Sequence, residues 1–476
     1  MRCSLSAFGV VFKQRRMAWS WWLLITISWL TGCAQHSQID RPTVDLEQWE
    51  TPLSEPTTPA LSDWWRSFGS DALNQMMQQA LAHNPDLSSA WLNLARAEIQ
   101  LQGVQADRLP VTLSAGAEAQ GGTSSATSGL QHQESSQLRL NISYEVDLWG
   151  RVAAQQAAGE AQLDASRYDL QAAQLSLTSR VAETWFQWLT LQAQQAEAQD
   201  QLARLTQQEQ LISARQRLGV ATEAELASQR ASRLQQQNQL TQIQQQSQQT
   251  RRALALLLGQ SYQGWQPPQA DLFDLALPLP DPSWPTALLT QRPDLARAEA
   301  QLRHAEANVV QARAALFPSV NLQASALLAS ETLFLHDPIR SLNLTSTLAQ
   351  TLFDRGARQR QIALSDVQRQ ILVETYRANL LNALMEVDNA LEQVQVQQQL
   401  AEQQLALLAA QEAIFAQTAQ RHRLGSASLS QRLEAQSQLA RTREQQLQLQ
   451  QAQLNARVQL YKALGGGIKQ QNDTPE

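Results

Sequence analysis

The sequence is 476 residues long and 43% of its residues are hydrophobic, so the chain can bury a sizeable core and has room for roughly two to four domains. Only 17% of the residues are charged and the net charge is −6, with no basic patch suited to a phosphate backbone, which argues against a nucleic-acid partner. The two cysteines, Cys3 and Cys33, both lie at the N-terminus, so the rest of the chain holds no disulfide framework.

The N-terminus has the features of a secretory signal. Basic residues precede an apolar run, Met17 to Leu30, that is too short to span a bilayer comfortably. The run leads to Leu-Thr-Gly-Cys, which resembles the bacterial lipobox and implies cleavage after residue 32 and acylation of Cys33. Ala34 stands where an Asp favours inner-membrane retention in lipoproteins, so we expect sorting to the outer membrane. A plain signal peptide with an incidental cysteine is the alternative.

The rest of the chain consists of two copies of an internal sequence repeat. The segment 83–110 aligns without a gap on 291–318, an offset of 208 positions, as in Pro85 and Pro293. Further on the offset is 206 positions, as in Gly219 and Gly425. From these matches we expect a signal over 1–32, a lipidated polar tether over 33–62, repeat 1 over 63–265, a linker over 266–284, repeat 2 over 285–467 and a polar tail over 468–476.

Each repeat is expected to contain two long helices. No proline occurs between Pro110 and Pro267 or between Pro338 and Pro475, so nothing in these stretches forbids a helix. A first helix of about 68 residues, roughly 100 Å long, would end at a Leu-Gly pair, and a second of about 39 residues would run back. Apolar residues recur at seven-residue spacing, which is typical of helices that pack lengthwise.

Two strands are expected in each repeat, because apolar and polar residues alternate there. The strands fall at about 111–119, 137–147, 320–330 and 341–353, and a Gly/Ser/Thr loop separates the first two. Each has about the nine to eleven residues that a tilted transmembrane strand needs. Four strands cannot close a barrel, and an open sheet edge is not tolerated in lipid. Either copies of the chain pool their strands, or the strands lie outside the membrane.

Several short motifs occur in a fixed order along nearly the whole mature chain. They are WWRSF at 64–68, Asn-Pro-Asp-Leu and Arg-Pro-Asp-Leu opening the two copies, a proline before each first strand, YEVDLWGR at 144–151, LFDRGARQ at 352–359 and the paired Leu-Gly turns. Together they resemble the TolC-like outer-membrane efflux factors, in particular the lipid-anchored branch that serves tripartite pumps of the RND type. The resemblance implies a mainly α protein with a membrane β-barrel. Three chains of four strands each would form one twelve-stranded barrel, continued by a long antiparallel coiled-coil tunnel.

The resemblance also implies a function. The homotrimer would be a passive duct in the outer membrane that receives small molecules from a periplasmic adaptor (membrane fusion) protein and an inner-membrane transporter. It would have a large periplasmic extension, no cofactor and no enzymatic activity. In such channels the Leu-Gly turns form the periplasmic mouth on which adaptor hairpins dock, which here implicates Arg217, Leu218, Gly219, Thr222, Arg423, Leu424, Gly425 and Ser428.

Acidic residues beyond each turn are candidates for a periplasmic gate. Glu225 and Glu434 fall where similar channels often carry gate carboxylates. Gln431 and His422 depart from the family, in which Asp and Tyr are common at these positions, so at most one strong carboxylate per copy remains. Solvated helix carboxylates with no special role are the alternative.

Trp149, Gly150 and Arg151 mark a strand-to-helix junction, where an aromatic residue anchors a barrel at the membrane boundary and glycine permits the turn. The six histidines are scattered, without pairs at metal-binding spacing, so we expect no metal site. No nucleophile or phosphate-binding motif occurs, so we expect no enzyme. Two other classes stay open, a general porin, which would be built mostly of strands, and a periplasmic coiled-coil scaffold, which would leave the alternating segments unexplained.

Overall fold

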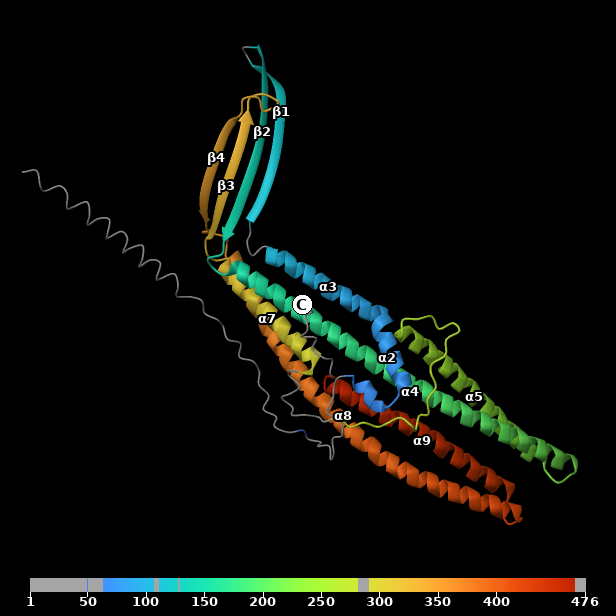
Figure 1. Ribbon diagram of the computed structural model, residues 1–476. Helices are drawn as coiled ribbons and strands as arrows, with labels where there is room; N and C mark the ends of the chain where they lie inside the picture. Colours follow the sequence, from blue (N-terminus) through green and yellow to red (C-terminus); the bar gives the residue numbers. More distant parts are fainter. Residues whose placement is uncertain (1–48, 50–62, 107–110, 127–128, 281–290, 467–476) are drawn as a thin grey trace, which may run out of the picture. The chain divides into compact units, whose positions relative to one another are not determined.

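The computed structural model describes residues 49, 63–106, 111–126, 129–280 and 291–466. The predicted signal, Cys33, nearly all of the tether and the C-terminal tail lie outside these residues. The described chain is mostly helical and contains one four-stranded sheet (Figure 1). None of the helices described is both long enough and apolar enough to cross a membrane.

The two repeats have the same order of elements. Repeat 1 contains a 3-10 helix η1 (Trp64–Phe68), α2 (Asp71–His83), α3 (Pro85–Ala106), β1 (Val111–Ala126), β2 (Gly129–Val146), α4 (Arg151–Arg217) and α5 (Glu223–Leu257). Repeat 2 contains α7 (Pro293–Ala314), β3 (Ser319–Ser330), β4 (Ile339–Ala349), α8 (Ala357–Arg423) and α9 (Leu429–Ala463). The long helices α4 and α8 have 67 residues each, and the return helices α5 and α9 have 35 each.

The sheet has the order β1-β2-β3-β4, and all neighbouring strands are antiparallel. Its register aligns one row of mostly apolar residues, Leu113, Ile142, Ala324 and Leu344. The adjacent row is polar and consists of Thr112, Ser143, Gln323 and Thr345. Because successive side chains of a strand point to opposite faces, the sheet has one mainly apolar and one mainly polar face.

The ends of the strands differ from the sequence-based expectation in two places. The expected loop between the first two strands is largely strand, paired residue by residue as far as Ala126 and Gly129. Gly, Ser and Thr suggested a loop, but an antiparallel ladder can continue through such residues once its register is fixed. The fourth strand ends at Ala349 rather than near 353, because the Asp354 carboxylate accepts hydrogen bonds from the N–H groups of Gly356 and Ala357 and starts α8.

A hydrophobic core joins the ends of the return helices to the middle of α4. Trp64 of η1 stacks on Tyr461 of α9 with 5.5 Å between ring centroids, and Phe68 lies 5.4 Å from Phe186 of α4. The chain between the repeats takes part as well, since the indole N–H of Trp185 donates to the carbonyl oxygen of Pro268. Trp64 and Phe68 of the WWRSF motif are therefore core residues, and the half-buried Trp65 packs against the core.

The helices beside the core pack in the order α3, α4, α7, α8 (Figure 1). Helix α4 is also covered by α5, α2 and α9, whereas α8 packs on α7 and α9. As a result, α4 buries many more side chains than α8, although the two helices have equal length.

Candidate functional site at the hairpin tips

Each long helix ends in a turn closed by backbone hydrogen bonds. At the end of α4, the Val220 N–H donates to the Arg215 carbonyl and the Gly219 N–H to the Gln216 carbonyl, at 2.9 and 3.0 Å. This pair of bonds is the Schellman motif, which requires a left-handed residue, and Gly219 has φ of +71°. The end of α8 repeats the motif around Gly425, which has φ of +74°.

Each return helix begins with a capping box. The Glu225 N–H donates to the Thr222 hydroxyl at 3.1 Å, and the Thr222 N–H donates to the Glu225 carboxylate at 2.7 Å. Ser428 and Gln431 make the same reciprocal pair at 3.2 and 2.9 Å. The capping box satisfies N–H groups that lack a partner at a helix start, so these four side chains fix where α5 and α9 begin.

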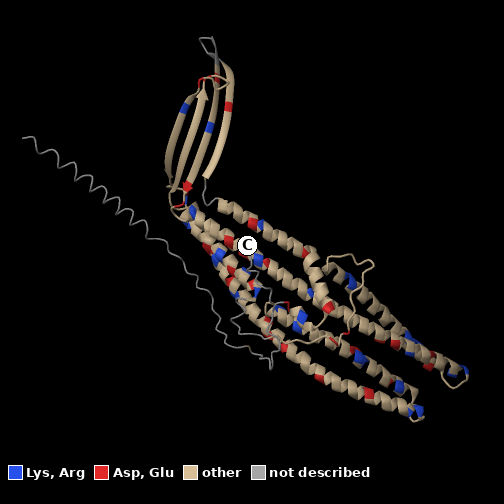
Figure 2. Ribbon diagram, viewed as in Figure 1, with Lys and Arg blue, Asp and Glu red and all other residues tan. Residues whose placement is uncertain are grey.

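All eight residues predicted to dock an adaptor lie on the exposed surface of the two turns. The leucines are the most unusual of them, with Leu218 78% and Leu424 75% exposed. Arginines gather at both tips (Figure 2), and they include Arg217 and Arg423 in the last helical turns. Positively charged side chains near a helix C-terminus are stabilised by the helix dipole, which explains part of this clustering of arginines.

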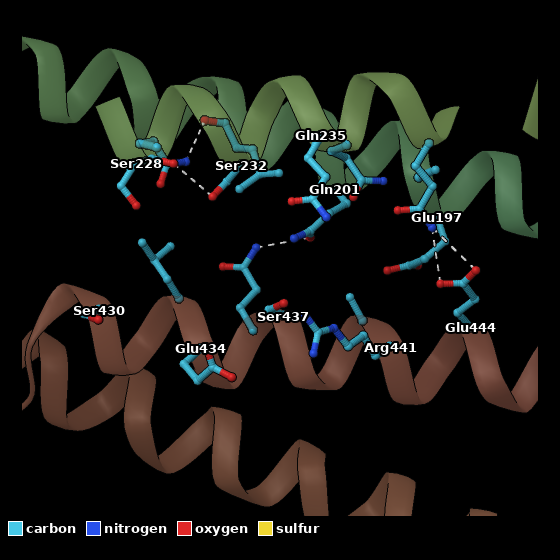
Figure 3. A pocket seen from close by; sticks show the side chains of 18 of the residues that line it. Glu197, Gln201, Ser228, Ser232, Gln235, Ser430, Glu434, Ser437, Arg441 and Glu444 are labelled. Carbon is cyan, nitrogen blue, oxygen red and sulfur yellow. Dashed lines mark hydrogen bonds between the residues drawn. The ribbon is translucent and has the colours of Figure 1, made fainter. Parts of the chain in front are cut away.

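Starting directly beside the turns, α4, α5 and α9 line a groove of about 680 Å³ (Figure 3). Its walls carry mostly Gln, Ser, Glu, Ala, Leu and Ile side chains, with Glu225 on α5 and Glu434 and Arg441 on α9. Bridging side chains join α4 to α9 along the groove. The Gln436 amide donates to Gln201 at 3.3 Å and accepts from Gln208 at 3.1 Å, and both Gln201 and Gln436 are buried. These amides tie the two hairpins of one chain together.

The four candidate gate residues lie in three different environments. Glu225 and Gln431 are the third residues of the capping boxes, and hydrogen bonds from the Thr222 N–H and then the Thr222 hydroxyl hold the pKa of Glu225 below its ordinary value. His422 sits inside the second turn, with Nδ1 3.0 Å from the carbonyl oxygen of Ala427. Glu434 is exposed and lines the groove, as Glu225 also does.

A second pair of Leu-Gly turns ends the return helices at the base of each repeat. The Schellman bonds recur there, but a Cβ added at Gly259 would lie 2.0 Å from the carbonyl oxygen of His83. At Gly465 the corresponding distance to Gln291 is 2.6 Å. The residues that follow His83 and Gln291 bind the end of the return helix. The Asn84 side chain donates to the Leu257 carbonyl oxygen and the Arg292 side chain to that of Ala463, both at 2.9 Å.

Trp149, Gly150 and Arg151 lie at the junction of β2 and α4. The Trp149 indole N–H donates to the carbonyl oxygen of Pro318 at 2.7 Å and the ring stacks on Phe317, so this side chain ties the start of β3 to the end of β2. Gly150 has φ of +72°, and Arg151 forms a two-point ion pair with Glu145 at 2.9 and 3.0 Å. The junction is thus held by contacts within one chain.

Sequence reasoning missed the capping boxes and the interlocking amides. The signal for the first was present, since Thr-x-x-Glu and Ser-x-x-Gln follow the two turns. Nothing in the sequence marked Gln201, Gln208 and Gln436 among so many glutamines. In the described part of the chain no group of three or more potential metal ligands comes together.

Comparison with known proteins gives matches over nearly the whole chain. A sequence model of a family described as outer membrane efflux protein matches twice, over residues 76–260 and 284–466. The pyoverdine export outer membrane protein OpmQ of Pseudomonas putida is 35% identical, covering 90% of this chain and 92% of OpmQ. The cation efflux system protein CusC of Escherichia coli is 28% identical, covering 93% of this chain and 97% of CusC.

Solved structures agree. A crystal structure of CusC superposes with a TM-score of 0.80 at 26% identity and covers 91% of this chain and 100% of that chain. The outer-membrane channel OprN superposes with a TM-score of 0.82 at 25% identity, covering 91% of this chain and 99% of OprN. These similar proteins are channels, and they share the combination of helices and strands described above.

Proposed function

The chain belongs to the outer membrane efflux protein family, and we propose that three copies of it form the outer-membrane duct of a tripartite export system. The chain is the outer-membrane channel component of an efflux system, and its family consists of channel proteins. The two-faced sheet is the observation that carries the proposal, because its apolar face suits lipid and its polar face suits a water-filled lumen.

The free edges of the sheet support a homotrimer. β1 and β4 stand at the two ends of the strand order, and their antiparallel directions allow β4 of one copy to pair with β1 of the next. An unpaired backbone group in hydrocarbon costs several kcal/mol, so these edges need partners in the membrane. Three copies supply twelve strands, an even number as in most bacterial barrels.

The tips support docking of a periplasmic adaptor protein. Leu218 and Leu424 are held in water by turns that are closed by their own hydrogen bonds, and their side chains make no contribution to the core. Each leucine is close in sequence to exposed polar residues of its own turn, Arg217 and Thr222 at one and Arg423 and Ser428 at the other, and apolar groups among polar ones are the usual anatomy of a protein interface. The adaptor would connect the duct to an inner-membrane transporter, which we propose to be of the RND type.

Acylation of Cys33 would add a lipid anchor to the barrel. The lipobox sequence supports this step, and mass spectrometry of the N-terminal peptide of the membrane protein tests it. A diacylated or triacylated Cys33 is expected. An unmodified Cys33, or a cleavage site elsewhere, contradicts it.

An organic cargo fits the comparisons better than a metal ion. The chain is 35% identical to OpmQ, which is named for pyoverdine export, and 28% identical to CusC, which is named for cation efflux. Only five methionines occur in the sequence, so a thioether path for soft metal ions has few ligands. We propose that the cargo is a siderophore or another polar organic molecule.

Deletion and complementation test the function. A strain that lacks the chain should retain siderophore or an organic toxin, and expression of the full chain should restore export. Purified protein should migrate as a trimer on non-denaturing gels and conduct in planar bilayers. Conductance from a monomer, or restored export without outer-membrane insertion, would overturn the proposal.

A further inference from the structure

The loop between β3 and β4, residues 331–338, is folded back onto the sheet. Ser136 of β2 pairs with Ser330, the last residue of β3, whereas the ladder between β1 and β2 runs on as far as its own turn (Figure 1). The extra length of β1 and β2 gives the loop a surface on which to lie. The loop contacts this surface through one polar and one apolar contact.

Two buried serines make the polar contact. The Ser136 hydroxyl donates to the carbonyl oxygen of Thr332 at 2.6 Å and accepts from the N–H of Leu335 at 2.9 Å. The Ser330 hydroxyl donates to the carbonyl oxygen of His336 at 2.6 Å. Ser136 and Ser330 are 5% and 8% exposed, so these hydrogen bonds are shielded from water. Together the two hydroxyl groups bind three backbone groups of the loop.

The loop backbone is held in a conformation that its residues rarely adopt. Leu335 and Asp337 have φ of +46° and +51°, in the left-handed region that is unfavourable for a residue with a Cβ. Such residues persist where the surrounding contacts determine the backbone. The N–H of Leu335 is one of the groups that Ser136 binds, so a strained residue and a buried hydrogen bond coincide. The loop therefore has one defined place on the sheet.

The register shows on which face of the sheet the loop lies. Side chains two positions apart on a strand share a face, so Ser136 lies on the face of Ile142, which is the mainly apolar one. Gly121 of β1 lies on this face as well, together with Leu113. A Cβ added at Gly121 would be 3.6 Å from the Leu333 side chain, so Leu333 packs on the apolar face. Both contacts place the loop on this face of the sheet rather than over the polar one.

The loop lies at the end of the apolar band of this face, on the side remote from the helices. On β4 the face runs from Leu348 to Arg340, at which the apolar side chains end. These two residues are eight positions apart. That distance is about 27 Å of strand, or about 21 Å of height at a tilt of about 40°. Barrels meet lipid over an apolar band of about 25 Å, so Arg340 and the loop that precedes it stand at the level of a membrane boundary.

The loop exposes a large apolar side chain at this level. Phe334 is 91% exposed, and the leucines on either side of it are half-buried. A fixed loop that exposes phenylalanine is unfavourable in water, whereas aromatic side chains are favoured where a barrel meets the lipid interface. Glu331 and Asp337 of the loop offset the charge of Arg340, so apolar side chains rather than a net positive charge suit the loop to a membrane.

We propose that the β3–β4 loop is a lipid anchor of the outer leaflet, in which Phe334 inserts into the membrane beside the barrel. The inference rests on the proposed duct, which turns the apolar face toward lipid and places the helices in the periplasm. The occupant is membrane lipid, because the loop continues the face that meets lipid. This loop lies outside the barrel wall, so it does not cover the mouth of the duct.

A nitroxide spin label at position 334 of the full chain tests this placement. Phe334→Cys, labelled and reconstituted in bilayers, should collide several-fold more often with oxygen, which dissolves in lipid, than with a water-soluble nickel chelate. The sequence has two other cysteines, Cys3 and Cys33, and the unsubstituted chain measures any labelling of them. A label at position 334 that only the nickel chelate reaches overturns the anchor. A label that neither reagent reaches means that a neighbouring copy covers the loop, which overturns it as well.

Matched controls lie on the two faces of β4. A label at Leu344→Cys should report lipid, and a label at Thr345→Cys, on the opposite face, should report water. If Leu344→Cys reports lipid and Phe334→Cys reports water, the anchor is wrong and the duct proposal stands. If Leu344→Cys reports water too, the apolar face does not meet lipid and the duct proposal itself fails.

Release of the loop is a second test. Ser136→Ala removes the hydroxyl that binds two backbone groups of the loop, so the label at position 334 should become more mobile and more accessible to the nickel chelate. Ser135→Ala, one position away on the polar face, is the matched control and should leave the label unchanged. Equal spectra for the two serine variants would contradict the proposed seat of the loop.

A variant without a label decides the matter if the cysteine variants fail to assemble. Phe334→Asp replaces the apolar anchor by a charge, which is unfavourable on the lipid side of a barrel. It should therefore lower the temperature at which the trimer dissociates in bilayers. The same dissociation temperature for Phe334→Asp and the unsubstituted chain would overturn the anchor.

Discussion

The tip turns and the base turns have nearly the same backbone but opposite surroundings. All four Leu-Gly pairs close a helix with the same Schellman bonds and a left-handed glycine. At the base, Leu258 and Leu464 are 0% and 1% exposed, and the glycines touch the backbone of a neighbouring segment. At the tips the leucines stand in water, and a Cβ added at Gly219 or Gly425 would meet nothing within 4 Å.

This difference distinguishes residues that the fold needs from residues that are free to bind a partner. Packing within the chain accounts for both the leucine and the glycine at the base. At the tips the glycine is explained by the turn, whereas the exposed leucine is explained by nothing inside the chain. A side chain that the fold does not use, repeated at the same place in two copies, is the observation behind the docking surface proposed above.

The largest expected effect comes from an alanine at the base. Gly259→Ala would place Cβ against the His83 carbonyl and strain a positive φ, so we expect a loss of about 3 kcal/mol or more and little folded trimer. Gly219→Ala should cost only about 1 kcal/mol, because it carries the strained φ without the clash. Trimer abundance on non-denaturing gels and thermal dissociation compare the two. Equal losses would mean that the turns are not distinguished by packing.

The next effect concerns export without unfolding. Leu218→Ser with Leu424→Ser removes the apolar centre of both tips, and we expect adaptor affinity to fall by about 2 kcal/mol, roughly thirtyfold. The trimer should form normally, while a strain that relies on this channel becomes susceptible to the exported compound. Leu258→Ser at the base is the matched control and should lose trimer and export in proportion. A tip variant that also loses trimer in proportion would make the tips merely structural.

Substitutions of Glu225 can distinguish the effect of its negative charge on conductance from the effect of its hydrogen bonds to the start of α5. We predict that Glu225 or Glu434 narrows the resting mouth, so replacing both by Ala should raise single-channel conductance in planar bilayers. Glu225→Gln is the sharper variant, because Gln431 already caps the equivalent helix in repeat 2. If conductance rises with Ala but not with Gln, the cap matters rather than the charge. An unchanged conductance in all variants leaves both residues as solvated carboxylates.

The smallest expected effect is local and depends on pH. The pKa of Glu225 is lowered in the folded state, so its contribution is complete above the unfolded value and is lost as pH falls through the folded value. As pH falls below the ordinary range of a glutamate carboxyl, about 4.3, the first turn of α5 should therefore begin to fray, while the first turn of α9, capped by Gln431, should not. Hydrogen-exchange protection of the two turns, compared between pH 7 and pH 3.5, measures this. Equal changes at both tips would contradict the role given to Glu225.

The lengths of the long helices were predictable because the sequence marks where they can run and where they end, by the absence of proline and by the Leu-Gly pairs. Helices α4 and α8 end within one residue of the expected Leu-Gly pairs, since leucine before glycine is the local signature of the turn itself. The return helices are a few residues shorter than expected, because the turn and the capping residue Thr222 or Ser428 precede each one. Family resemblance predicted the fold class and the channel function, which the comparisons confirm.

Other features depend on contacts that sequence patterns do not contain. The close approach of Gly259 to His83 joins residues far apart in the chain, and no local sequence pattern near either residue predicts this contact. The extended β1–β2 hairpin was missed because Gly and Ser have low strand propensity, while pairing with the opposite strand decided the outcome. Thr222 and Glu225 were assigned to separate docking and gate roles, although their spacing already described one capping box.

The equal lengths of the two hairpins restrict how this channel can change in evolution. A residue inserted into only one hairpin would move its tip by about 1.5 Å along the helix axis and rotate every later side chain of that helix by about 100°. A partner that contacts both tips would then find them at different heights. Tolerated length changes should therefore occur as matched insertions in both arms of both hairpins. They should also come in steps of about seven or eleven residues, which return the apolar stripe to its original face. The reach of the duct across the periplasm would then vary in coarse increments rather than residue by residue.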